Sequence, residues 1–272
     1  MGIPDFARPR SVIGWAVVCG VAAGLVAATY FSIAGEPAID DAIAIEEALA
    51  GAGDTAADAE AGHSDDDDGV EISRSTQRGV GLFSGYAVFG GAFGVLLALA
   101  SLTLRGDWLD PFRRVAVAGT TLAGAVTVVP WFKYPPNPPA VGDPDTAGTR
   151  QGWYLLLIAV AGLVLAGAAH LSARLRRAGW PVARRVAAVG GATAVVLGGV
   201  LAGLPASDVA IPVEMPTSLI WRFRTASLVG NLICWSLLTV SFGLLWAESA
   251  RRKAAAPGAQ NSMPLSAEMP AS

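Results

Sequence analysis

A group of carboxylates follows the first apolar stretch of the chain and has the chemistry of a cation-binding segment. Glu36, Asp40 and Glu47 fall on one helical stripe, because offsets of 4 and 11 residues return near the same angle. His63 comes later, just before the four aspartates at 65–68. Carboxylates favour hard cations and imidazole favours transition metals. Our candidate metal ligands are therefore Glu36, Asp40, Glu47 and His63. Alternatively, residues 51–70 form a solvated acidic linker that only concentrates cations.

A second candidate segment is rich in proline and reads PWFKYPPNPPAVGDPDTAGTRQGWY from residue 130 onward. Proline fixes its own backbone and restrains the residue before it, which predicts a stiff, non-helical loop. We assign seven residues of this segment to an ion-entry loop: Lys133, Tyr134, Pro135, Asn137, Pro138, Asp143 and Arg150. Alternatively, the loop is a structural lid that its aromatic residues anchor at the level of the lipid headgroups.

Two arginines, Arg222 and Arg224, stand at the start of the last apolar stretch. They are two residues apart and therefore point to different helix faces. A charge at this depth is costly unless it is paired or reaches the interface. We expect both to be structural charges that hold carboxylates of the neighbouring loops in place. The alternative is that both arginines are unpaired and extend their guanidinium groups to the membrane surface.

Apolar helices must position all of these residues. The chain has 272 residues, of which 53% are hydrophobic and 15% charged, against about 25% charged in soluble domains. Crossing a bilayer takes about 20 apolar residues. Six stretches qualify, and they predict an all-α polytopic membrane bundle within residues 1–250, with spans at 12–34, 79–104, 114–132, 152–173, 184–204 and 219–247. Residues 35–78 form an acidic outer loop that begins as a continuation of the first helix, and 251–272 a disordered cytoplasmic tail.

Glycines in two of these spans have the spacing that lets helix backbones approach closely in lipid. Gly20 and Gly24 lie in the first span, and Gly90 and Gly94 lie in the second. Alternatively, the spacing reflects only how common glycine is in this chain.

The distribution of positive charge predicts the orientation of the bundle. Of the 19 Lys and Arg residues, thirteen lie in the two terminal segments and in the second and fourth loops. Four lie in the first and third loops, and the remaining two are the arginines at the start of the last span. Cytoplasmic segments carry the excess of positive charge. We therefore expect a multi-pass protein of the plasma membrane with both termini in the cytoplasm.

Motifs of several enzyme classes are missing from the sequence. It contains no phosphate-binding glycine loop, no nucleophile elbow, no HExxH and no CxxC. An ATP-driven pump within this one chain and a membrane protease are therefore disfavoured. We expect no enzymatic activity, no tightly bound cofactor and no nucleic-acid partner.

Three segments together resemble the CbtA-type cobalt transporter subunit family. They read GWAVVCGVAAGLVAATYFSIAGEPAIDDAIAIEEA, KYPPNPPAVGDPDT with its flanks, and WRFRTASLVGNLICW. The motif positions are Glu36, Pro37, Lys133, Tyr134, Pro135, Asn137, Pro138, Pro139, Gly142, Asp143, Thr146, Arg150, Trp221, Arg222 and Arg224. The resemblance implies cobalt uptake linked to cobalamin metabolism and a small one-span, histidine-bearing CbtB-type partner. The chain departs from the family in having one histidine in its first loop and six spans instead of the usual five.

The leading hypothesis is therefore a membrane subunit that takes up cobalt or a related divalent cation. Glu36 and Asp40 are the candidates for direct contact with the ion, and cobalt is the expected transported substrate. One alternative is a non-transporting scaffold or assembly subunit, because no Asp or Glu lies in the middle of a span. A second alternative is a membrane enzyme that acts on a lipid or envelope precursor.

Overall fold

The computed structural model describes residues 6, 8–57, 73–104, 110–142, 146–206, 209 and 211–255. Within these residues all regular structure is helical. The elements are α1 (Pro9–Ala34), α2 (Glu36–Ala57), α3 (Arg74–Thr76), the π-helix η1 (Gln77–Gly81), α4 (Leu82–Thr103), α5 (Pro111–Ala123), the π-helix η2 (Gly124–Val128), α6 (Val129–Lys133), α7 (Ala147–Arg177), α8 (Val182–Gly203) and α9 (Thr217–Ala255).

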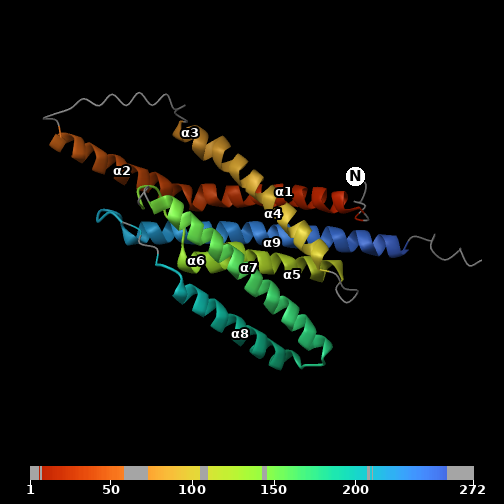
Figure 1. Ribbon diagram of the computed structural model, residues 1–272. Helices are drawn as coiled ribbons and strands as arrows, with labels where there is room; N and C mark the ends of the chain where they lie inside the picture. The colour runs from red at the N-terminus through yellow and green to blue at the C-terminus, as the bar shows by residue number, and fades with distance from the viewer. Residues whose placement is uncertain are drawn as a thin grey trace, which may run out of the picture.

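Six helical segments are long and apolar enough to cross a membrane, which confirms the predicted number of spans. They are Pro9–Ala34, Arg74–Thr103, Pro111–Lys133, Ala147–Arg177, Val182–Gly203 and Thr217–Ala255. The start of α1 and the end of α9 lie at the same end of the bundle (Figure 1). We call the opposite end, where α1 passes into α2, the α2 end. The protein is therefore a multi-pass helical bundle, and residues 256–272 of the expected tail lie outside the described part.

Two glycine pairs hold α1 and α4 in close contact. A Cβ added to Gly20 would collide with the backbone carbonyl of Gly90, and one added to Gly90 would collide with that of Gly20. Gly24 meets the backbone of Tyr86 in the same way, and Gly94 meets that of Ala16. The prediction from the glycine spacing is confirmed, because at this crossing there is no space for a side chain.

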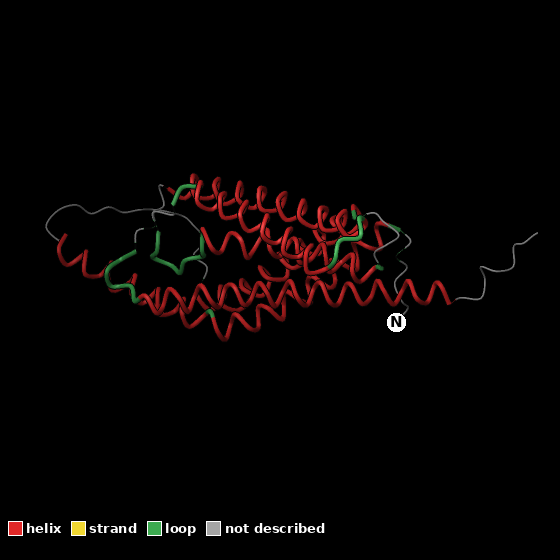
Figure 2. The backbone as a smooth tube through the Cα atoms, turned by 90° about the horizontal axis from the view of Figure 1, so that it is seen from below, coloured by secondary structure: helices red, strands yellow, loops and turns green. Residues whose placement is uncertain are grey.

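The core lies where α1, α4, α5 and α9 meet. Among its buried side chains are Val12, Leu97, Trp235 and Phe242, each 2% exposed or less. Trp235 stacks on Phe93 with ring centroids 4.5 Å apart. In contrast, α8 packs mainly on α7 and has one buried residue, Val189. Figure 2 shows the helices running along a common direction, with loops gathered at the two ends. This arrangement brings the loop segments of interest to one end.

The third span is interrupted just before its end. Pro130 lies at the start of α6, directly after the π-helical turn of η2. Proline has no N–H to donate to the helix ladder, and such interruptions are absorbed by wider π-helical turns. The Nε1 atom of Trp235 donates to Thr127 Oγ1 in this turn at 3.1 Å. This π-helical turn therefore has a fixed position against α9.

The first helix continues beyond its span after a one-residue break at Gly35. This agrees with the helix expected over the first part of the acidic loop. Figure 1 shows α2 leaving the bundle along the general direction of α1. The carboxylates of α2 thus begin where the span ends.

Candidate functional site

The first carboxylates of α2 are bound by arginines from α3 and η1. Arg74 Nη2 donates to Glu36 Oε2 at 2.6 Å and to Asp40 Oδ1 at 2.9 Å. Arg78 Nη1 donates to Asp40 Oδ2 at 3.0 Å. The i, i+4 spacing of Glu36 and Asp40 presents both carboxylates on one face of α2. Arg74 and Arg78 have the same spacing and likewise lie on one face of their helical segment. We call these four residues the carboxylate–arginine cluster.

The cluster is buried on one side. Glu36 is 3% exposed, whereas Asp40 is 38% and Arg78 is 51% exposed. A buried carboxylate is stable as a charged group only when it is paired and hydrogen-bonded. Arg74, which contacts both carboxylates, provides that pairing for Glu36. The segment at the start of α4 is thereby fixed to α2.

A further carboxylate of α2 connects it to α9. Arg222 Nη2 donates to Asp41 Oδ2 at 2.7 Å, and both side chains are more than half exposed. Beneath this pair, Ala42 packs with Met215 and Leu219 in a small apolar cluster. The first loop and the segment before α9 thus meet at the α2 end.

The proline-rich loop is held by the other arginine of α9. Arg224 Nη2 donates to Asn137 Oδ1 at 2.7 Å, and Trp131 Nε1 donates to the backbone carbonyl of Arg224 at 3.1 Å. The hydroxyl of Tyr134 donates to the carbonyl of Pro205 at 3.0 Å. Desolvation raises the pKa of Tyr134 above its ordinary value. The loop therefore has contacts with both α9 and the end of α8.

The remaining predicted residues have different surroundings. Lys133 ends α6 and is half-buried, and Pro135 and Pro138 follow it in the loop as half-buried and buried residues. Arg150, in the first turn of α7, lies against Gly142 of the loop. Glu47 is exposed on α2 and away from the cluster. His63 and Asp143 lie outside the described residues.

The structure thus brings together three segments that are far apart in the sequence. Sequence reasoning did not foresee that Arg74 and Arg78 take part. The signal that would have found the arginines is their i, i+4 spacing, which matches that of Glu36 and Asp40. Sequence reasoning expected loop carboxylates as partners of Arg222 and Arg224; Arg222 binds one, Asp41, whereas Arg224 binds the amide of Asn137. Within the described residues, no three His, Cys, Asp or Glu side chains are grouped as metal ligands. Instead, three arginines balance the charge of three carboxylates.

Comparison with known protein families finds a family whose sequence model matches the chain. The sequence model of a family described as "Probable cobalt transporter subunit (CbtA)" matches residues 10–247. The chain belongs to the CbtA family. This match covers four of the six spans in full, the first and the last except for their outer ends, and all three segments of the α2 end. No curated protein and no solved structure matches the chain. The family description names a probable subunit of a cobalt transporter.

Proposed function

We propose that this CbtA-family chain is the membrane subunit of a cobalt uptake system that serves cobalamin metabolism, and that the cation enters at the α2 end. Family membership supports cobalt as the substrate. The observation that carries the entry site is the convergence of the three motif segments at one end of the bundle, around the carboxylate–arginine cluster. The charge distribution supports an outward-facing α2 end and cytoplasmic termini in the plasma membrane.

The chemistry of entry is an exchange of cations at Glu36 and Asp40. Their two carboxylates hold two guanidinium groups, those of Arg74 and Arg78. A divalent ion carries the same total charge as these two groups, so the exchange leaves the two carboxylates neutralised once both guanidinium groups have moved out to water. Neutrality is important here because an unbalanced charge beside the bilayer is costly. Arg74 and Arg78 in this proposal hold the site in the absence of metal and move aside when the ion binds.

Further ligands and partners complete the proposal. Carboxylate oxygens alone select poorly for cobalt over other divalent ions. Glu47 and His63 of the first loop are additional candidate ligands, and a small one-span CbtB-type subunit with a histidine is the candidate partner. Arg222 and Arg224 act as structural charges that position α2 and the proline-rich loop.

The test is uptake of radioactive cobalt by cells that express the wild type or the double variant Glu36→Gln/Asp40→Asn. We expect uptake to fall to background in the double variant. The matched control is Asp41→Asn, which also removes a carboxylate that an arginine binds, but outside the cluster. Membrane abundance of each variant is measured in parallel. Full uptake by the double variant, or an equal loss in Asp41→Asn, would refute the entry site.

One observation favours a second candidate function, a scaffold subunit that does not itself conduct the ion. Glu36, Asp40 and Asp41 are all paired with arginines. Reconstitution of the purified chain into liposomes separates the two functions. Cobalt flux through the chain alone supports the transport role, whereas flux that requires a second subunit and is unchanged by Glu36→Gln/Asp40→Asn supports the scaffold role.

A further inference from the structure

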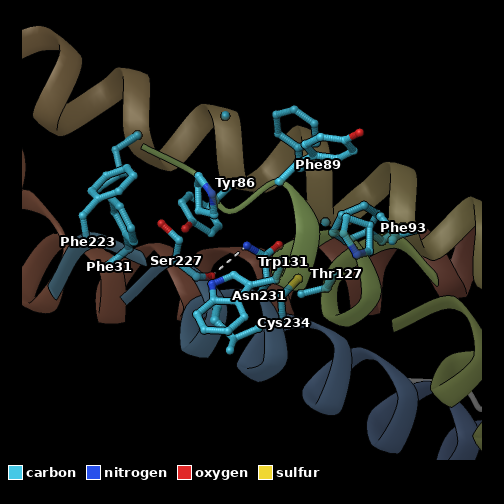
Figure 3. A pocket seen from close by; sticks show the side chains of 18 of the residues that line it. Phe31, Tyr86, Phe89, Phe93, Thr127, Trp131, Phe223, Ser227, Asn231 and Cys234 are labelled. Carbon is cyan, nitrogen blue, oxygen red and sulfur yellow. Dashed lines mark hydrogen bonds between the residues drawn. The ribbon is translucent and has the colours of Figure 1, made fainter. Parts of the chain in front are cut away.

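A cavity lies between α4, α6, α7 and α9 and reaches Ile39 of α2 and Gly81 of η1, but none of the four residues of the carboxylate–arginine cluster lines it. Its volume is about 870 Å³, within the range of small-molecule sites. Aromatic side chains from four helices form much of its wall: Tyr86, Phe89 and Phe93 of α4, Trp131 of α6, Tyr154 of α7 and Phe223 of α9. Figure 3 shows several of these rings around the open space.

The walls of this cavity provide little for a cation. No Asp, Glu, His, Lys or Arg is among the described residues that line it. Polar side chains in the wall bond to the protein itself: Asn231 Nδ2 donates to the carbonyl of Ser227 at 2.9 Å, and Trp131 Nε1 is bonded to α9. An ion inside would have few groups to replace its hydration shell. The surface therefore suits an apolar ligand.

The cavity is accessible from the lipid. It is lined by Phe89 on α4 and by Tyr154 and Ile158 on α7, and these two helices have no extended contact with each other. Phe89 is 66% exposed although it lines the cavity. An empty apolar space loses dispersion contacts, and water there lacks polar partners. A cavity of this kind within the spans fills from the bilayer.

The size of the cavity decides between the two apolar occupants that a membrane offers. A transmembrane helix, about 10 Å wide and about 30 Å long, has a volume of roughly 2400 Å³, so it could not lie wholly within a cavity of about 870 Å³. A single hydrocarbon chain is much thinner. The lining runs from Phe93 and Cys234 within the spans to Tyr134 and Pro136 at the α2 end, which matches a chain that enters from the headgroup level.

We propose that this cavity binds one acyl chain of a membrane phospholipid as a structural ligand between α4 and α7. The bound chain fills the space beside Pro130, which lines the cavity. The inference does not depend on cobalt transport, since it follows from the apolar walls and the volume alone.

The experiment counts phospholipids that stay bound to the purified chain, by native mass spectrometry from mild detergent. Gly85 lines the cavity, and a Cβ added there meets no atom within 4 Å. We expect Gly85→Trp to fill the space and to lower lipid occupancy at least tenfold. The matched control is Gly167→Trp on α7, where a Cβ is equally free but the residue does not line the cavity. It should retain lipid as the wild type does.

A second measurement on the wild-type chain covers the case in which Gly85→Trp fails to fold. A phospholipid with a photoreactive acyl chain is added to vesicles of the reconstituted protein, and the cross-linked peptides are mapped. Cross-links at Phe89 or Tyr154 support the proposal, and cross-links spread evenly over α8 refute it. A wild-type chain without retained lipid would also overturn the proposal. Gly85→Trp with unchanged lipid but no cobalt uptake would overturn it as well and would make the cavity a cation path.

Discussion

Replacement of Arg74 by glutamine tests how the carboxylate–arginine cluster is held together. Arg74 contacts both Glu36 and Asp40, and Glu36 is 3% exposed. Removing one partner of a buried ion pair costs about 3–5 kcal/mol, because the other charge stays buried without compensation. At about 2–4 °C per kcal/mol for a chain of this size, the melting temperature should fall by on the order of 10 °C.

The matched control is Arg78→Gln. Arg78 pairs only with Asp40, and their side chains are 51% and 38% exposed. Exposed pairs contribute about 0–1 kcal/mol, so the melting temperature of this variant should change by no more than about 4 °C. The assay is thermal unfolding of the purified chain in one detergent, followed by intrinsic tryptophan fluorescence.

A double variant identifies the buried charge as the cause. Arg74→Gln/Glu36→Gln removes both members of the pair and leaves two neutral amides that can hydrogen-bond. We expect it to recover more than half of the stability that Arg74→Gln loses, because the unpaired buried carboxylate is gone. Equal losses in Arg74→Gln and Arg78→Gln, or no recovery in the double variant, would refute this reasoning.

Two further predictions concern other contacts of the bundle. Gly90→Leu should prevent correct assembly of α1 and α4, because a side chain there meets backbone. Gly190→Leu on α8 has open space and should be tolerated. The yield of monodisperse protein in size-exclusion chromatography measures this, and equal yields of the two variants would contradict the prediction. Arg224→Gln should weaken the hold on Asn137 and speed hydrogen exchange of the loop amides at 134–142 by about tenfold. Arg222→Gln should leave that exchange unchanged, since Arg222 pairs with α2 instead; equal exchange in the two variants would show that the loop is held by other contacts.

The sequence by itself determined the number and the order of the spans. The thickness of the bilayer fixes how long an apolar stretch must be, and this property is local in the chain. The even number of spans places the start of the first span and the end of the last at one end of the bundle, as the structure has it for α1 and α9. The close approach of α1 and α4 was also predictable, because the spacing of Gly20, Gly24, Gly90 and Gly94 has a direct geometric meaning in a helix.

Only the tertiary structure decided which charges meet and where space remains. Arg74 contacts Glu36 across 38 positions of the chain, and Arg222 contacts Asp41 across 181. Such pairings depend on how whole helices are placed, and many other pairings would satisfy the same composition. The cavity likewise depends on how far apart α4 and α7 lie, which no single segment encodes. Local hydropathy specifies each helix, whereas the packing of six helices together specifies the ion pairs and the empty volume.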